Sequence, residues 1–269
     1  MEFTCTDILP GVRQIGDGLG NFCTLLTGGH GALLYDTMTG LGDLRHYVEE
    51  LYGRTPAVVN SHCHFDHMGG NFQFDRVHMA RADLPLLEVG REEIGILEQT
   101  LHRDLTDMTA SFTGLDRIVP LDGGEVFDLG GLTAQVVPLP GHTPGCIGLL
   151  CPELRLLLAG DALSPQCCIF FPESLPLSDY AALLDAAEQL PFDRFLSAHF
   201  DFLFPKSALE KFRACIPLVG VKRGMEYAFP PLPFLKGRIY MAKAMDPELH
   251  QPICLITRPE EKGLSSHDA

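Results

Sequence analysis

Short apolar runs separated by glycines mark the start of the chain. The run at 31–36 (Gly-Ala-Leu-Leu-Tyr-Asp) predicts a buried strand. Apolar residues at 44, 47, 48 and 51 have the spacing of one helix face, and Gly53 stands where that helix would stop. The run at 57–60 predicts another buried strand. The chain therefore passes from strand to helix to strand, and then directly into Ser-His-Cys-His-Phe-Asp-His at 61–67.

Helices and strands continue to alternate along the rest of the chain. The helical pattern at 81–110 is interrupted by Pro85, Gly90 and Gly95. A later helix is predicted to be capped by Ser178 and ended by Pro191. Further strands are predicted at 125–128, 132–137, 154–159, 194–198, 238–241 and 253–257, and a further helix at 206–215. Mixed elements in this order predict a layered α/β fold.

The composition fits one large folded unit, or a domain with a small appendage. Of the 269 residues, 46% are hydrophobic, which allows a sizeable core. No apolar run of eighteen residues occurs, so neither a membrane-spanning helix nor a membrane partner is expected. The first residues have no basic start and no apolar stretch, so no secretory signal is expected. Nine scattered cysteines without a Cys-x-x-Cys pair predict reduced, mostly buried thiols and a cytoplasmic protein.

The charge balance argues against one class of partner. Twenty basic residues against 35 acidic ones give a net charge of −15, and no cluster of lysine or arginine occurs. Because nucleic-acid binding gains most of its affinity from neutralising phosphates, no nucleic-acid partner is expected. A small molecule is therefore the expected partner, and the sequence does not indicate an oligomeric state.

Candidate metal ligands gather at 61–67. His62 and His64 are two residues apart, which places both imidazoles on one side in extended or turn geometry. Asp66 and His67 follow at once, so four ligand-type side chains can serve two adjacent cations with two ligands each. A catalytic zinc usually has three protein ligands and an open position, so this set is incomplete by itself.

Three more candidate ligands follow predicted strands. His142 lies in Pro-Gly-His-Thr-Pro-Gly, Asp161 lies in Ala-Gly-Asp, and His199 follows the predicted strand at 194–198. Ligands at the carboxyl ends of strands lie where open α/β sheets commonly place their sites. Imidazoles and carboxylates suit zinc, iron or manganese. The ligand types do not distinguish these metals, and zinc is the expected metal on prior grounds only.

These motifs, in this order, resemble the metallo-β-lactamase superfamily. They are His-x-His-x-Asp-His, Gly-Gly-Asn at 69–71, Pro-Gly-His-Thr-Pro-Gly, Gly-Asp and the late histidine, and the match covers roughly residues 10–205. The resemblance implies a four-layer αββα sandwich, with a catalytic core at 1–205 and a segment at 206–269 that completes or flanks it. It also implies a first metal on His62, His64 and His142, a second on Asp66, His67 and His199, and Asp161 as the bridge between them.

Two departures narrow the branch. True β-lactamases lack a second metal-site histidine of this kind and have Cys where Asp161 stands, so the chain looks more like glyoxalase II, lactonases and phosphodiesterases. The diiron flavoproteins have Glu in place of His64, which disfavours that redox branch. The tail differs from the helical, basic glutathione-binding domain of glyoxalase II, which weakens a glutathione thioester assignment.

The expected activity is that of a dinuclear metal-dependent hydrolase. Two cations about 3.5–4 Å apart can hold a bridging hydroxide at neutral pH, which would attack a small ester, thioester or lactone. Asp66 would bind metal and orient the hydroxide or relay its proton. Tyr35, Tyr180 and Ser164 are the candidate general acids, although structural roles for the tyrosines are equally compatible with the sequence.

Three other functions stay open. One is a phosphodiesterase, against which the acidic charge counts. Another is a persulfide dioxygenase with a single iron, which has a similar motif set. The last is a non-catalytic metal-binding scaffold, which the complete set of seven ligand positions disfavours.

The remaining polar residues are given structural roles. Cys63 is expected to pack in the core, Asn71 to stabilise a loop or helix start, and Gly141 and Gly145 to allow the turn that aims His142. The other histidines are expected to be surface or satisfied residues: His30, His46, His78, His102, His250 and His267. Three regions are expected to form the walls of the substrate site: 81–110, an apolar loop at 163–176 with Phe170 and Phe171, and 205–269. The last residues, 263–269, are expected to fray.

Overall fold

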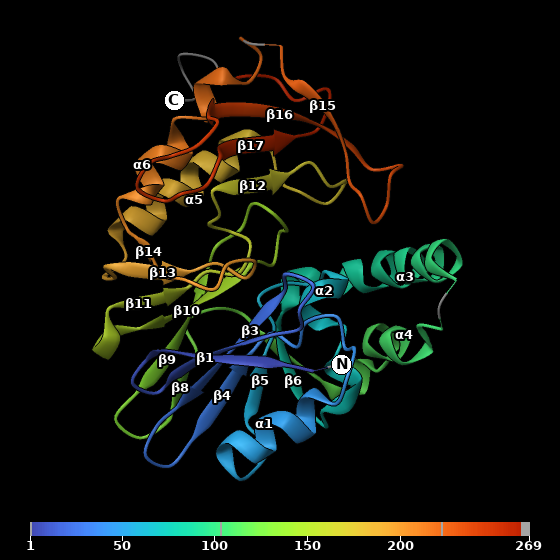
Figure 1. Cartoon of the computed structure of the whole chain (residues 1–269), viewed down its shortest axis with the longest axis vertical. Coiled ribbons are helices and arrows are strands. Elements are labelled where there is room, and N and C mark those ends of the chain that lie inside the picture. Colours follow the sequence, from blue (N-terminus) through green and yellow to red (C-terminus); the bar gives the residue numbers. More distant parts are fainter. Residues whose placement is uncertain (1, 103, 222, 265–269) are drawn as a thin grey trace.

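Two facing sheets form the centre of the molecule (Figure 1). The computed structural model describes residues 2–102, 104–221 and 223–264. The first sheet has seven strands in chain order: β1 (Thr4–Leu9), β2 (Val12–Gly16), β3 (Phe22–Thr27), β4 (Ala32–Tyr35), β5 (Ala57–Val59), β6 (Val77–Ala80) and β7 (Ile118–Leu121). Strands β1 to β4 are antiparallel, and β4 to β7 are parallel. The strands predicted at 31–36 and 57–60 are confirmed as β4 and β5.

The second sheet has six strands in the order β14-β13-β11-β10-β9-β8. They are β8 (Val126–Asp128), β9 (Thr133–Pro138), β10 (Ile147–Cys151), β11 (Leu156–Leu158), β13 (Arg194–Leu196) and β14 (Phe204–Pro205). Side chains from both sheets meet in one apolar layer, in which Leu26, Leu33, Leu149 and Leu158 have no exposed surface.

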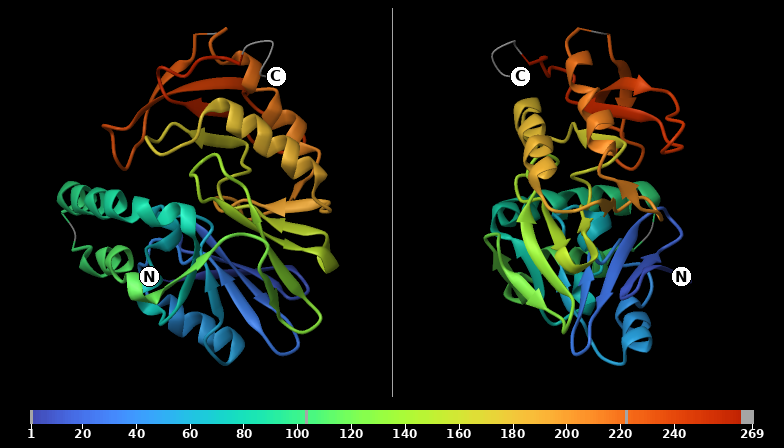
Figure 2. Two further views of the ribbon diagram at one scale, coloured as in Figure 1. Left: turned by 180° about the vertical axis from the view of Figure 1, so that it is seen from behind. Right: turned by 90° about the vertical axis from the view of Figure 1, so that its left-hand side faces the viewer.

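Helices cover both outer faces of these sheets (Figure 2). Helix α1 (Leu44–Tyr52) packs on the first sheet through Leu44 and Val48, and it ends at Gly53 as predicted, where φ is 90°. Helices α5 (Leu177–Gln189) and α6 (Ala208–Arg213) cover the second sheet. The result is the αββα sandwich that the sequence resemblance implied. No helix of the described residues is long and apolar enough to cross a membrane.

A third sheet lies beyond α5 and α6. Its four strands have the order β12-β17-β16-β15 and are β12 (Gln166–Ile169), β15 (Met225–Ala228), β16 (Lys236–Lys243) and β17 (Ile253–Thr257). Strand β12 pairs in parallel with β17, so a strand from the middle of the chain joins the three strands that follow α6. Three of the four strands of this third sheet thus come from 206–269.

Two helices beside the first sheet differ from the prediction. Helix α3 (Leu87–Leu101) runs without interruption through Gly90 and Gly95, and α4 (Thr106–Thr113) packs against it. A Cβ on Gly90 would lie 2.4 Å from the ring of Phe112, so the glycine permits close helix packing instead of breaking the helix. The predicted interruption at the glycines is therefore wrong. Pro85 lies in the preceding 3₁₀ helix, Arg81–Leu86.

The remaining elements are short. Helix α2 (Phe65–Met68) carries two candidate ligands. The other single-turn 3₁₀ helices are Asn71–Gln73, Leu115–Arg117, Pro152–Leu154 and Ile216–Leu218. Ser178 does not cap α5, because the helix begins one residue earlier and the Ser178 hydroxyl donates to Asp179. Leu264 packs on the core beside α6, so fraying from residue 263 is wrong for the described part of that tail, and 265–269 lie outside the described residues.

The cysteines and isolated histidines mostly behave as expected. All nine cysteines are unpaired, and seven of them are buried. Cys63 is 3% exposed within an apolar cluster, which confirms a packing role. Asn71 begins a 3₁₀ turn and exchanges hydrogen bonds with Asn60. His78 bonds the carbonyl of Val58, whereas His267 lies outside the described residues.

Candidate metal centre

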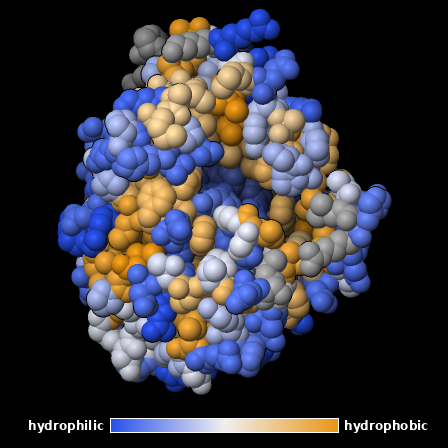
Figure 3. All heavy atoms as spheres, viewed as in Figure 1, coloured by the Kyte–Doolittle hydropathy of each residue, from blue (hydrophilic) through white to orange (hydrophobic). Residues whose placement is uncertain are grey.

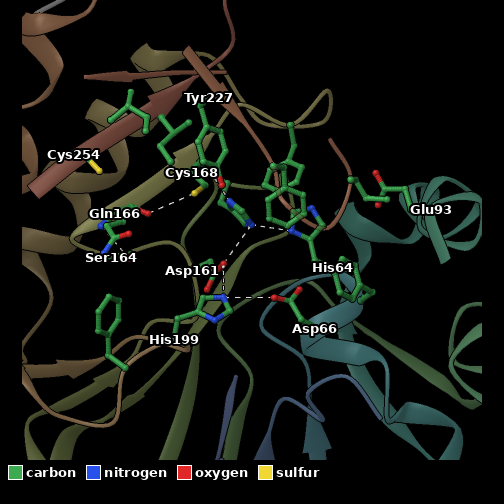
Figure 4. Close-up of a pocket in the computed structure, with 18 residues that line it drawn as sticks. His64, Asp66, Glu93, Asp161, Ser164, Gln166, Cys168, His199, Tyr227 and Cys254 are labelled. Carbon is green, nitrogen blue, oxygen red and sulfur yellow. Dashed lines mark hydrogen bonds and ion pairs between the residues drawn. The ribbon is translucent and has the colours of Figure 1, made fainter. Parts of the chain in front are cut away.

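The structure brings the seven candidate ligands to one edge of the two sheets. His62 and His64 follow β5, Asp66 and His67 lie on α2, and the others follow strands of the second sheet. Figure 4 shows His64, Asp66, Asp161 and His199 converging from these loops. Three groups can each hold a metal ion, with ligand atoms within 4.8 Å of one another: His62, His64 and His142; His62, His67 and Asp161; and Asp66, His67 and His199.

The first group consists of three imidazoles. His64 Nδ1 lies 3.0 Å from His62 Nε2 and 2.9 Å from His142 Nε2. Burial, with the neighbouring His67 and His64, holds the pKa of His62 well below its usual value, and burial with nearby His64 lowers the pKa of His142 to about 4. Both rings are therefore neutral at pH 7, and each offers a lone pair to a cation.

The second group contains a carboxylate. Asp66 Oδ2 lies 3.8 Å from His67 Nε2 and 3.6 Å from His199 Nε2. Asp161 Oδ2 lies between the two groups, 3.2 Å from His199 Nε2 and 3.7 Å from His142 Nε2. Burial opposes ionisation of Asp161, but His199 and His67 outweigh it and hold the pKa of this carboxyl well below its usual value.

Each of the five imidazoles has its other nitrogen hydrogen-bonded away from the centre. His62 Nδ1 faces the Ser61 hydroxyl at 2.9 Å, and His67 Nδ1 faces Asp36 at 3.0 Å. The corresponding partners of the other three are the Cys168 carbonyl for His142, the Gly20 carbonyl for His199 and the Glu173 carboxylate for His64. Such bonds fix the tautomer and direct the free lone pair inward, as the outer partners of metal-binding histidines do.

Unpaired buried atoms support a cation here. His67 Nε2 and Asp161 Oδ1 are buried and have no hydrogen-bond partner among the described residues. An unsatisfied buried polar atom costs about 1–3 kcal/mol, so two in one cluster indicate a missing partner. Neutral imidazoles and ionised carboxylates are the donors that divalent cations such as zinc prefer. The residues present therefore fit divalent metal ions.

Several important residues were missed in the sequence. Asp36 is 1% exposed, and it accepts hydrogen bonds from the Ser61 amide and hydroxyl as well as facing His67. Its φ is 70°, an unfavourable conformation that its three partners maintain. A carboxylate at the end of a predicted buried strand was the available signal. Glu173 lies in the 163–176 loop and had no signal of its own.

Asp83 connects the two loops that carry the first group. It is fully buried and accepts hydrogen bonds from the Cys63 amide, the Thr143 hydroxyl and the Gly145 amide. A Cβ on Gly145 would lie 2.5 Å from Asp83 Oδ1. The requirement at this glycine is therefore close approach to Asp83, which corrects the expectation of a conformational role in the turn.

A cavity of about 300 Å³ opens from the centre. Figure 3 shows the molecule hollowed between the third sheet and α3. All three expected wall regions contribute, through Glu93, through Phe171 and Ser164, and through Tyr227 and Ile239. Of the candidate general acids, only Ser164 lines this cavity, because Tyr35 donates to the Ile147 carbonyl at 2.6 Å and Tyr180 is buried in the core.

Comparison with known proteins indicates the family to which the chain belongs. The family model described as the metallo-beta-lactamase superfamily matches residues 16–199. Human acyl-coenzyme A thioesterase MBLAC2 is 26% identical over 200 residues, which cover 66% of this chain and 72% of that protein. A hydroxyacylglutathione hydrolase from Hyphomonas neptunium is 30% identical over 111 residues, which cover 41% of this chain and 35% of the relative.

Solved structures share the fold. A Burkholderia ambifaria beta-lactamase domain protein superposes with a TM-score of 0.59 at 21% identity, covering 78% of this chain and 74% of that one. The sec-alkylsulfatase Pisa1 from Pseudomonas sp. superposes with a TM-score of 0.61 at 17% identity, covering 79% of this chain and 41% of that one. The family model covers more than half of the chain, and the chain therefore belongs to the metallo-β-lactamase superfamily of metal-dependent hydrolases.

Proposed function

We propose that the protein hydrolyses a small thioester or ester with an apolar acyl group, using two divalent cations, with zinc as the expected metal. The observation that carries this proposal is the position of the metal-binding cluster at one end of an apolar cavity. Its walls include Phe65, Phe171, Phe229, Leu232, Ile239 and Ile256, and within the described part of the chain it has no lysine or arginine.

The cavity composition narrows the substrate. An apolar acyl chain gains about 25 cal/mol per Å² of surface that it buries, and these walls offer such surface. Away from the metal ions, a strongly anionic group would meet Glu93 with no lysine or arginine among the lining residues to bind it. The human relative is named an acyl-coenzyme A thioesterase and the bacterial relatives hydroxyacylglutathione hydrolases, so a thioester is the bond that both names share.

Each side chain of the centre has a proposed task. His62, His64 and His142 would hold one cation, Asp66, His67 and His199 the other, and Asp161 would contact both. Bound divalent cations supply Lewis acidity and make water nucleophilic near neutral pH. Asp66 lines the cavity with a side chain that is 20% exposed, so it is placed to accept a proton from the attacking water. Phe171 and Phe229 exclude solvent from the reacting bond.

The test combines metal analysis with a substrate panel. Purified protein is analysed for metal content and assayed with acyl-coenzyme A esters of increasing chain length, an acyl-glutathione, a lactone and a phosphodiester. We expect about two zinc ions per chain, chelator-sensitive hydrolysis, and preference for apolar acyl chains. One iron per chain with oxygen uptake and no hydrolysis would establish a dioxygenase, and preference for the phosphodiester would overturn the acyl substrate.

A pair of variants tests the wall directly. Ile239→Asp places a charge in the cavity, whereas Leu115→Asp changes an exposed leucine that is not among the cavity-lining residues. We expect a KM increase of about tenfold for long acyl substrates in the first variant, from the loss of one buried aliphatic contact, and wild-type kinetics in the second. Equal KM values in the two variants would show that the acyl chain does not contact this wall.

A further inference from the structure

One continuous segment, residues 168–175, contacts two of the three histidines of the first group, His64 and His142. The carbonyl of Cys168 accepts a hydrogen bond from His142 Nδ1, and the hydroxyl of Ser174 donates to the His142 carbonyl at 2.8 Å. Glu173 Oε1 accepts from His64 Nε2 at 2.7 Å. The ring of Phe171 lies 4.6 Å from that of His64, so the same segment also reaches the cavity.

The second group has a separate set of partners. His67 is held by Asp36, which follows β4, and His199 by the carbonyl of Gly20 in the loop between β2 and β3. The 168–175 segment makes no hydrogen bond to either of these histidines among the described residues. A change in this segment should therefore reach one metal position and leave the other.

Glu173 is unusual among the partners of the centre. Its side chain is only 9% exposed, and its second oxygen, Oε2, is buried with no hydrogen-bond partner among the described residues. Burying a carboxylate with an unpaired oxygen costs free energy, so a purely structural role would be served more cheaply by a neutral side chain. The charge itself therefore calls for an explanation.

The composition of the first group supplies one. Its three own ligands are imidazoles, which supply no negative charge, whereas the second group has Asp66, and Asp161 lies between them. A divalent cation on three neutral donors gains from a nearby negative charge, and a carboxylate on the distal N–H of a histidine makes that histidine a stronger donor.

We propose that Glu173 is a positioning residue for the first metal position: it holds His64 with Nδ1 facing the cation and supplies the negative charge that the three imidazoles lack. This inference rests on the proposed two-metal function. It assigns Glu173 to the first metal position only. The 168–175 segment would then both form part of the cavity wall and influence metal affinity.

The experiment compares Glu173→Gln and Glu173→Ala with the wild type and with Glu92→Gln, which removes an exposed carboxyl on α3. Metal-free proteins are titrated with zinc against a chromophoric chelator, and with cobalt while the visible spectrum is recorded. For Glu173→Ala we expect one of the two positions to lose about 10- to 100-fold in affinity, with an altered cobalt spectrum. The glutamine variant, which keeps the acceptor but not the charge, should fall between, and Glu92→Gln should match the wild type.

Each result has a defined meaning. Affinities within twofold of the wild type in both Glu173 variants would overturn the proposal, and equal weakening of both positions would overturn its selectivity. If the glutamine variant has the zinc affinity of the wild type while the alanine variant binds zinc more weakly, the proposed role of the charge is overturned. Melting curves of the metal-free proteins identify misfolded variants, and the isosteric glutamine keeps the test valid if the alanine variant does not fold. A wild type that binds no metal would refute the proposed function instead.

Discussion

The two groups of the metal centre are built from different parts of the molecule. The second group is held by Asp36 and Gly20, both of which belong to the first sheet and its loops. In the first group, His64 and His142 are held by residues 168–175, which also contribute to the cavity wall and continue from β12 of the third sheet, whereas His62 faces the Ser61 hydroxyl. The difference teaches that a change on the substrate side can reach the first metal position, whereas the second is positioned by the first sheet and its loops.

The loop that holds His199 shows how hydrogen bonds position the second group. Asp17 is 2% exposed, and its carboxylate accepts hydrogen bonds from the amide of Leu19 and from the side chains of Asn21 and Thr39. These bonds fix the loop that presents the Gly20 carbonyl to His199. Within the described residues, none of these hydrogen bonds involves the third sheet.

The largest effect is expected where the two groups meet. Asp161→Asn replaces the carboxylate that faces both groups with a neutral amide. Because metal-ion catalysis contributes several kcal/mol, kcat/KM should fall by at least about a thousandfold. Steady-state kinetics and metal content measure this change, with circular dichroism as the control for folding. A variant that keeps more than a tenth of the activity would show that the two groups work independently.

A large but one-sided effect is expected at Asp36. Asp36→Ala leaves buried His67 without its carboxylate and Ser61 without its acceptor, so the free energy of unfolding should fall by about 3–5 kcal/mol. Urea denaturation of the metal-free protein measures it. In Asp36→Asn, which keeps the shape, zinc affinity should fall mainly at the position that Glu173 variants spare, because Asp36 contacts His67 directly and His62 only through Ser61. A larger loss at the position that Glu173 holds would contradict the division into two groups.

A smaller effect should follow from Gly145→Ala. The new Cβ would lie 2.5 Å from Asp83 Oδ1, which should cost about 1–3 kcal/mol of stability and weaken the first metal position. Gly95→Ala is the matched control, because its Cβ meets nothing within 4 Å inside α3, and it should stabilise the protein by about 0.5–1 kcal/mol. Thermal melting compares the stability of the two variants. A Gly145 variant as stable as the control would show that close approach to Asp83 is not required to connect the ligand loops.

The smallest effect concerns pH at the cavity wall. Burial raises the pKa of Glu93 to about 7, with His64 opposing the shift and Glu173 and Asp66 adding to it. The carboxyl is neutral below that value and charged above it, so KM for an apolar substrate should rise a few-fold between pH 6 and 8. Glu93→Gln should make KM independent of pH over this range. The same rise in the glutamine variant would place the titrating group elsewhere.

Local patterns predicted the parts of the structure that depend on local chemistry. The spacing at 44–51 and the glycine after it define α1, and the 61–67 sequence with three later strand ends brings seven candidate ligands together. Strand periodicity does not identify which other strand a given strand pairs with, so the pairing of β12 with β17 was not predictable. Gly90 gave the wrong signal because its role depends on Phe112 in another helix.

The sequence also did not identify which residues would hold the ligands. Asp36 and Glu173 are ordinary carboxylates until the fold buries them against His67 and His64. Ser178 had the right residue type for a helix cap, but α5 begins at Leu177 and leaves it inside the first turn. In each case tertiary packing decided a role that residue type and spacing left open.

The parallel pairing of β12 with β17 has a consequence for biosynthesis. A ribosome releases the chain from its amino end, and pairing between distant segments forms slowly. All seven candidate ligands have been synthesised by His199, well before β17 at Ile253–Thr257 can join β12. All seven candidate ligands are therefore present before the strands that complete the third sheet and its part of the cavity wall have been synthesised.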